Sequence, residues 1–216
     1  IISYEGSGST ATSGHGLGVQ PELLLFKNRS VTKAWMVLAK ENQTTYLNLA
    51  STGSGQTGYY LSGNTFDSRM TTSLITVDGS TTEVNTSGED YICYAFASIP
   101  GFSKVGAFEG NASSTDGPMI VTGFSPAFVI GKAVDQSGRW WMYDSERSPT
   151  MNNIGGTGAR LEADDHAAEK SDSTANRIQF LSNGFKVNSS NAEWNDATHL
   201  YLAFAKLPQK YSLARS

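Results

Sequence analysis

The amino-acid sequence predicts an all-β protein, an antiparallel β-sandwich of the jelly-roll or lectin-like kind built from two homologous repeats. Three observations predict this: a composition rich in turn-forming residues, many short apolar runs, and similarity between the two halves of the 216-residue chain. Charged residues make up only 17% of the chain, which is instead rich in glycine (22 residues), serine and threonine. Gly, Ser, Thr, Asn and Asp each favour turns, so short strands joined by turns are expected.

Strands are predicted wherever a short apolar run lies between turn residues. In chain order these runs are 23–26, 35–38, 46–49, 73–77 and 91–97, then 119–121, 128–130, 140–143, 178–181, 185–187 and 200–205. Two of them, Tyr91–Ala97 and Leu200–Ala205, are apolar at consecutive positions, which indicates strands covered on both faces. Helix is predicted for under about a tenth of the residues, because turn-rich all-β chains contain little of it. Only Leu161–Lys170 suggests a helix.

The two halves share seven short matches in the same order, at offsets of 103 to 109 residues. The matches are Tyr4-Glu5-Gly6 with Phe108-Glu109-Gly110, Gly18 and Pro21 with Gly123 and Pro126, Pro21–Lys27 with Pro126–Lys132, Trp35-Met36 with Trp141-Met142, Val84-Asn85 with Val187-Asn188, Ala95-Phe96-Ala97 with Ala203-Phe204-Ala205, and Phe102-Ser103 with Tyr211-Ser212. Unrelated β proteins reuse similar strand segments, but a shared order favours duplication.

The duplication predicts a first β repeat at residues 1–103 and a second at 104–216. A repeat this long exceeds the 20–50 residues of solenoid units, so each copy is the size of a domain. The copies form either two small sandwiches or two halves of one larger sandwich. In either case Trp35 and Trp141 are expected at equivalent buried positions, and so are Phe96 and Phe204.

Composition also excludes several function classes. The formal charge is −4 with 20 acidic and 16 basic residues, so no nucleic acid partner is expected. No apolar run reaches the 18 or so residues that a membrane-spanning helix needs, and no membrane insertion is expected. The single cysteine, Cys93, cannot form an internal disulfide and is expected to behave as a small buried hydrophobe. The chain starts at Ile1 without a visible signal peptide, which favours a fragment or a processed product.

No enzyme, cofactor or metal site is predicted. His15, His166 and His199 lie far apart without metal-ligand spacing, and no nucleophile elbow or phosphate-binding loop occurs. The acidic segment 162–169 either binds calcium through its oxygens or is a solvated loop, and both alternatives stay open.

Two segments distinguish the second half from the first: Asp135–Tyr143 and Asn191–Asp196. Adjacent strand residues point to opposite faces, so if Trp141 is buried, Trp140 is expected to face outward. Together the segments hold four candidate ligand-binding residues, Arg139, Trp140, Trp194 and Asp196. Indole rings can stack on sugars while Arg and Asp form directional hydrogen bonds. The alternative is that these rings pack between the halves or between protomers.

The motifs also resemble a known family. GHGLGVQPELLLFKNRS (14–30), GFSKVGAFEGNASSTDGPMIVTGFSPAFVIGKAVDQSGRWWMYDSER (101–147), FLSNGFKV (180–187) and YLAFAKLPQKYSLAR (201–215) are similar to a duplicated domain of unknown function. That domain occurs in tail-associated and other virion proteins of tailed bacteriophages, including marine ones. No catalytic residues are established for it, so none are carried over to this sequence.

The resemblance implies a virion location, in a tail or surface appendage, with other virion proteins as partners. A tail-fibre or receptor-binding module that contacts a host surface receptor or glycan is the expected function. The alternative is a purely structural virion module, such as a fibre spacer, a tail component or a head decoration protein. Because symmetric assembly gives weak sites useful avidity, a homotrimer is expected in the virion.

Overall fold

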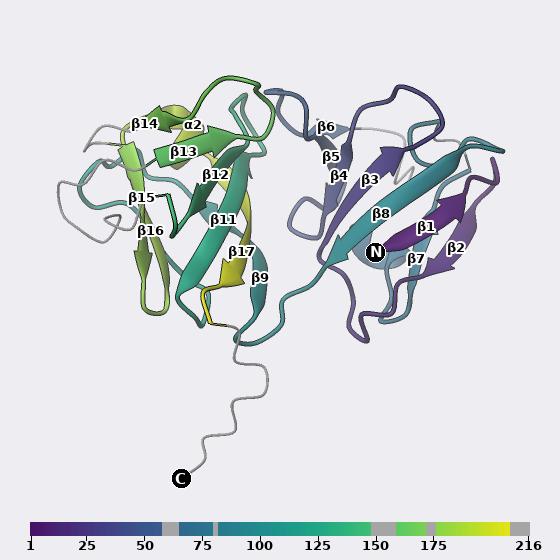
Figure 1. Ribbon diagram of the computed structural model, residues 1–216, viewed down its shortest axis with the longest axis horizontal. Helices are drawn as coiled ribbons and strands as arrows, with labels where there is room; N and C mark the ends of the chain where they lie inside the picture. The colour runs from purple at the N-terminus through teal and green to yellow at the C-terminus, as the bar shows by residue number, and fades with distance from the viewer. Residues whose placement is uncertain (58–64, 80–81, 148–158, 172–175, 208–216) are drawn as a thin grey trace, which may run out of the picture. The chain divides into compact units, whose positions relative to one another are not determined.

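The computed structural model describes residues 1–57, 65–79, 82–147, 159–171 and 176–207. The chain divides into two compact units, Ile1–Ala97 and Ser98–Ser216, so this division lies a few residues before the predicted start of the second repeat (Figure 1). Both units are β-sandwich-like and every strand pair among the described residues is antiparallel, which confirms the predicted fold class at this level.

The first unit contains a six-stranded and a two-stranded sheet. The order in the larger sheet is β1 (Ile2–Glu5), β8 (Asp90–Phe96), β3 (Leu23–Asn28), β4 (Met36–Ala39), β5 (Thr45–Asn48) and β6 (Gln56–Thr57). β2 (Ala11–Gly14) pairs with β7 (Leu74–Val77), and α1 (Phe66–Arg69) precedes β7. Thr65 begins this short helix with a capping box, in which its side chain accepts a hydrogen bond from the Ser68 amide.

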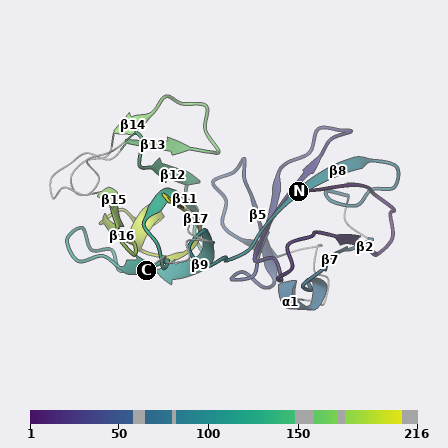
Figure 2. The same cartoon turned by 60° about the horizontal axis from the view of Figure 1, so that its bottom comes forward.

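The core of the first unit lies between its two sheets. Figure 2 shows β2, β7 and α1 on one side of the sheet that contains β8. Leu24 and Cys93 from that sheet pack with Ile75 of β7 and Phe66 of α1, and each is completely buried. Burial raises the pKa of the Cys93 thiol, so this cysteine is an inert core residue, as the sequence predicted.

The second unit contains a six-stranded and a three-stranded sheet. The order in the larger sheet is β14 (Lys170–Ser171), β13 (Ala159–Glu162), β12 (Trp141–Asp144), β11 (Pro126–Ala133), β17 (Thr198–Ala205) and β9 (Ser103–Glu109). The smaller sheet has the order β10 (Met119–Val121), β16 (Gly184–Ser189), β15 (Asn176–Leu181), and α2 (Ala192–Asn195) precedes β17. Buried residues from both sheets, the β10–β11 turn and α2, including Trp141, Phe185 and Trp194, form one core.

The expected helix at Leu161–Lys170 is wrong. This segment begins at the end of β13, turns, and finishes in β14. Glu162 pairs with Trp141 across the β12–β13 ladder. Pairing between distant strands thus overrides a weak local helix preference, as tertiary context commonly does.

The six-stranded sheets of the two units have the same strand order. Traced from β1 the first is β1-β8-β3-β4-β5-β6, and traced from β9 the second is β9-β17-β11-β12-β13-β14. The register also corresponds at the sheet centres, where Leu23 lies opposite Phe96 and Phe128 lies opposite Phe204. This agreement supports the proposed duplication.

One lysine contact recurs in both units. Lys27 of β3 donates from Nζ to the carbonyl of Lys33, at 2.8 Å. Lys132 of β11, the residue matched to Lys27, donates from Nζ to the carbonyl of Gly138, at 2.5 Å. In each case the acceptor lies six residues later, in the connection to the next strand. Each lysine therefore stabilises the corresponding connection in its own unit.

The predicted equivalence of Trp35 and Trp141 is wrong by one residue. The amide of Leu49 donates to the Trp35 carbonyl, and the amide of Ala163 donates to the Trp140 carbonyl, so Trp35 corresponds to Trp140. A shift of one residue moves a strand side chain to the other face of the sheet. Trp35 is accordingly half-buried, with its ring 6.0 Å from that of Tyr94, whereas Trp141 is buried in a core.

Phe96 and Phe204 do occupy equivalent register positions, but both are half-buried and not part of either core. The ring of Phe204 lies 6.0 Å from that of Phe102 and 6.4 Å from that of Phe128. The expectation of full burial is therefore wrong, because these side chains project from the face of the sheet opposite the core.

Candidate functional site

The two segments that distinguish the second half of the sequence lie side by side in the second unit. Gln136 donates from Nε2 to the carbonyl of Asp196, at 3.4 Å, and the amide of Thr198 donates to the carboxylate of Asp135, at 3.1 Å. The sequence therefore identified two segments that meet in space.

The tryptophans in these segments are nevertheless buried. Trp140 is 3% exposed and Trp194 is 2% exposed, so the expectation that these rings are open to a ligand is wrong. The Trp194 ring meets Tyr143 edge to face with 5.8 Å between centroids, and the Arg160 guanidinium lies 4.2 Å from its centroid. This cation–π contact and the surrounding core exclude stacking on a ligand. Both rings are buried, and the contacts of Trp194 lie within the second unit, whereas the sequence-based alternative placed the rings between the halves or between protomers.

Arg139 belongs to a network of charges that lies beside these rings. Its guanidinium contacts Glu162 at 3.6 Å, Asp164 at 3.3 Å and Asp165 at 3.5 Å. Asp164 also accepts a hydrogen bond from the Trp140 amide, at 2.9 Å. Arg139 is about one-third exposed and is occupied by these three carboxylates, while Asp196 is exposed at the end of α2.

Glu162 is the centre of this network. Its side chain is 4% exposed and contacts Arg160 at 3.1 Å and Lys170 at 2.5 Å, besides Arg139. Burial alone would raise the pKa of Glu162, but the hydrogen bonds from Lys170 and Arg160 outweigh burial and hold that pKa below its ordinary value. The positive charges of Arg139, Arg160 and Lys170 thus balance the negative charges of the three carboxylates.

The calcium alternative for the acidic segment gains no support from this geometry. Glu162 and Asp165 face the basic side chains of Arg139 and Lys170, while Asp164 faces Arg139. Within the described ranges, no group of three or more His, Cys, Asp or Glu side chains is arranged to hold a metal ion.

Replacing Glu162 by glutamine should destabilise the second unit by about 1–3 kcal/mol at pH 7, because three cations then lose their central carboxylate. Since the folded-state pKa of Glu162 is lowered, the wild-type contribution is complete above the ordinary value of 4.5 and is lost as the pH falls below it. Urea unfolding of E162Q and wild type at pH 7 and pH 3 measures both effects. E169Q is the control, because the Glu169 side chain is about half exposed and contacts Arg147 at the surface. A cost that stays constant between these pH values would contradict the prediction.

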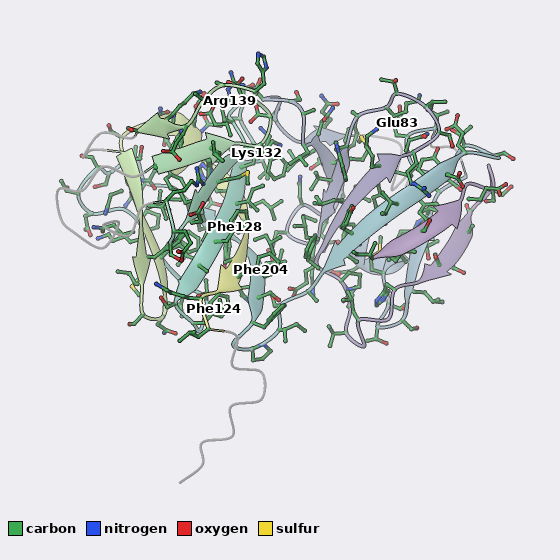
Figure 3. The ribbon with its side chains drawn as sticks, viewed as in Figure 1. Glu83, Phe124, Phe128, Lys132, Arg139 and Phe204 are labelled. Atoms are coloured by element: carbon green, nitrogen blue, oxygen red, sulfur yellow. The ribbon has the colours of Figure 1, made fainter. Side chains whose placement is uncertain are left out.

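A second site, which the sequence did not indicate, lies at the other end of β11. It is a pocket of about 480 Å³ lined by Gly101, Gly123, Phe124, Ser125, Ser182, Lys206 and Leu207. Figure 3 shows Phe124 at the end of the sheet opposite Arg139. Four stretches form the walls: the segment before β9, the β10–β11 turn, the β15–β16 hairpin and the residues that follow β17.

A neighbouring pocket of about 410 Å³ shares Gly101 and Gly123 with the first. Both glycines have positive φ, 69° and 87°, which L side chains rarely adopt, so the shared wall carries no side chain at these positions. The other lining residues are Ser98, Ile99, Pro100, Ser103, Lys104, Val121 and Thr122. The match of Gly18 with Gly123 had identified this turn in the sequence, but nothing had indicated a cavity.

Exposed apolar side chains line these pockets. Val121 is 58% exposed and lines the second pocket, and Leu207 is 72% exposed and lines the first. Phe102, 40% exposed, is the neighbour of Gly101 in the chain. Ligand sites commonly measure about 300–1,000 Å³ and combine apolar lining with a few polar groups. The pockets therefore form the candidate binding site.

The histidines make local contacts in separate places. His15 lies in the first unit, with Nε2 3.1 Å from the Thr71 carbonyl oxygen, and His166 is fully exposed. His199 is buried against the Phe108 ring, 4.9 Å away, and burial lowers the pKa of its imidazole. These positions bring no two histidines together.

No helix in the described part of the chain is long and apolar enough to cross a membrane. Comparison with curated proteins and with solved structures gave no match. Comparison with protein families matched residues 1–208, nearly the whole chain, to one family. The chain therefore belongs to the family described as Domain of unknown function (DUF7483).

Proposed function

We propose that this chain is a module of a tailed-phage virion protein that contacts the host cell surface, through a receptor or a glycan. The observation that carries the proposal is the pair of adjoining pockets at one end of the second unit, with exposed apolar side chains and two lysines in their lining. The resemblance of the sequence motifs to virion modules supports the same function.

The architecture suits this role. Binding residues commonly lie on loops held by a rigid scaffold, and the pocket walls here are connections between strands of two sheets. Backbone hydrogen bonds fix these walls: the Thr122 amide donates to the Asn183 carbonyl at 3.1 Å, and the Lys206 amide donates to the Ser125 carbonyl at 2.8 Å. A jelly-roll or lectin-like topology, an origin by duplication and a homotrimeric state in the virion are parts of the proposal.

A purely structural virion module is the second candidate. The observation that favours it is the burial of Trp140 and Trp194. The segments that distinguish the second half then serve to pack its core and not to contact a ligand. Under this alternative the pockets face other virion proteins.

Binding of the labelled full chain to cells of the bacterium that propagates the parent phage tests the proposal. Saturable binding to these cells, with loss of binding to mutants that lack the surface polysaccharide or receptor, is the expected result. Immunogold labelling of intact virions accompanies it. Labelled virions without cell binding would favour the structural module, and absence of the chain from virions would overturn both candidates.

A further inference from the structure

We infer that the two adjoining pockets of the second unit bind an anionic saccharide, a sugar that carries a carboxylate or a phosphate. The pockets lie at residues that neither the sequence motifs nor the family comparison assigns to a site. The biological source of the saccharide, the host surface, rests on the proposed function; the chemistry of the site does not.

The charge of the lining is opposite to that of the chain. Lys206 lines the first pocket and Lys104 lines the second, and none of the described residues that line either pocket is acidic. The whole chain has 20 acidic and 16 basic residues and a formal charge of −4. A site with one lysine in each pocket and no carboxylate therefore favours a ligand with separate single negative charges.

The rest of the lining suits a sugar ring. Val121 and Leu207, both exposed, offer apolar surface for the C–H faces of a pyranose, and Ser125 and Ser182 offer hydroxyl groups for its polar edge. Every hydroxyl can both donate and accept, which matches the hydroxyl groups of a sugar.

The polar groups of the second pocket hold its wall in place. The Ser98 hydroxyl accepts from the Val105 amide at 3.1 Å, and the Thr122 hydroxyl donates to the Phe124 carbonyl at 2.7 Å. These bonds fix the walls before any ligand arrives, which lowers the entropic cost of binding.

The small number of basic residues in the lining argues against a nucleic acid. A polyanion is recognised by neutralising many phosphates with a basic face, and here the net charge of −4 repels such a ligand. Two pockets that share one glycine wall instead fit consecutive sugars, each with one lysine beside it. An oligosaccharide with an acidic residue in each repeat unit should therefore bind more tightly than one acidic monosaccharide.

NMR titration of the ¹⁵N-labelled full chain tests the inference. The probes are D-glucuronic acid and a glucuronate-containing tetrasaccharide, glucose 6-phosphate, and methyl glucoside as the neutral sugar. We expect the anionic probes to shift the amides of Gly101, Gly123 and Lys206, and the tetrasaccharide to bind more tightly than the monosaccharide. The stronger of the two anionic monosaccharides identifies the anionic group as carboxylate or phosphate.

Substitution of the pocket lysines supplies the sharper comparison. K206Q should weaken binding of the tetrasaccharide about tenfold, as expected for the loss of one charge-assisted contact, and K104Q should act in the same direction. K186Q is the matched control, because it removes the same charge from the same unit at a residue that lines neither pocket and contacts Asp116. Unchanged melting temperatures for all three variants show that folding is unaffected.

Equal affinity for methyl glucoside, equal affinity of K206Q and K186Q, or shifts confined to other residues would overturn the inference. The outcome is separate from that of the proposed function. Anionic sugars that bind the pockets while host cells do not bind the chain would leave the site intact and refute the function. Host cells that bind wild type and the K104Q/K206Q double variant equally would refute the site and retain the function.

Discussion

Replacement of Trp194 by alanine should destabilise the second unit by about 3–5 kcal/mol, the usual cost of removing a large buried aromatic side chain. The Trp194 ring is 2% exposed, meets Tyr143 edge to face and has the Arg160 guanidinium over one side. The variant loses apolar burial, an aromatic pair and a cation–π contact together. The Arg160 guanidinium does not fill the space left by the indole ring, because its ion pair with Glu162 holds it in place. Urea unfolding followed by tryptophan fluorescence measures the loss.

Asp196→Ala is the matched control, since Asp196 follows the same short helix but is exposed. Its cost should stay within about 0.5 kcal/mol, because its hydrogen bond with Gln136 uses the backbone carbonyl and not the carboxylate. Equal stability of W194A and wild type would mean that the ring is not part of the core. Loss of cell adhesion by W194A without any loss of stability would restore the original interpretation of Trp194 as a binding residue.

Gly131→Ala should cost about 1–3 kcal/mol, through overpacking of the core of the second unit. Gly131 lies directly opposite Trp141 in the β11–β12 ladder, and a Cβ atom there would collide with the indole ring. The corresponding pair in the first unit is Phe26 opposite Met36. The corresponding residue pairs of the two units thus differ in which strand carries the larger side chain. It is on β3 in the first unit, as Phe26, and on β12 in the second, as Trp141.

A double-mutant cycle tests this exchange of volume. In the Trp141→Met background the cost of Gly131→Ala should fall close to zero, which gives a coupling free energy of about 1 kcal/mol or more between the two positions. Gly138→Ala is the control, because its Cβ would meet no atom closer than 3.5 Å. Additive costs for G131A and W141M would show that the ring does not fill the space above Gly131.

The same exchange explains why the tryptophan match in the sequence was misleading. Met36 and Trp141 occupy corresponding register positions, so the visible pair of tryptophans, Trp35 and Trp141, is displaced by one residue. A large side chain can move to a neighbouring strand when a glycine or a smaller residue opens the space. Identical letters in two repeats are therefore weaker indicators of equivalent positions than hydrogen-bond registers.

The strands that the sequence predicted and those that it missed differ in position within the sheets and in how many of their side chains are buried. All eleven predicted runs overlap strands of the structure, because buried strands must carry apolar side chains. The missed strands are β1, β2, β6, β9, β13 and β14. Most of these lie at or near sheet edges, where fewer side chains are buried and the local pattern is weak: β1 and β9 are edge strands, as are β6 and β14.

The sequence by itself determined the all-β class, most of the strands that carry the two cores, and the two segments of the second half that meet in space. Only the tertiary structure decided that Trp140 and Trp194 are both buried: the single turn of α2 places Trp194 in the core, and the one-residue register places Trp141, not Trp140, there. The pockets were equally invisible in the sequence. Their lining comes from four separate stretches, around residues 98–104, 121–125, 182 and 206–207, and a cavity exists only where the folded chain brings such stretches together.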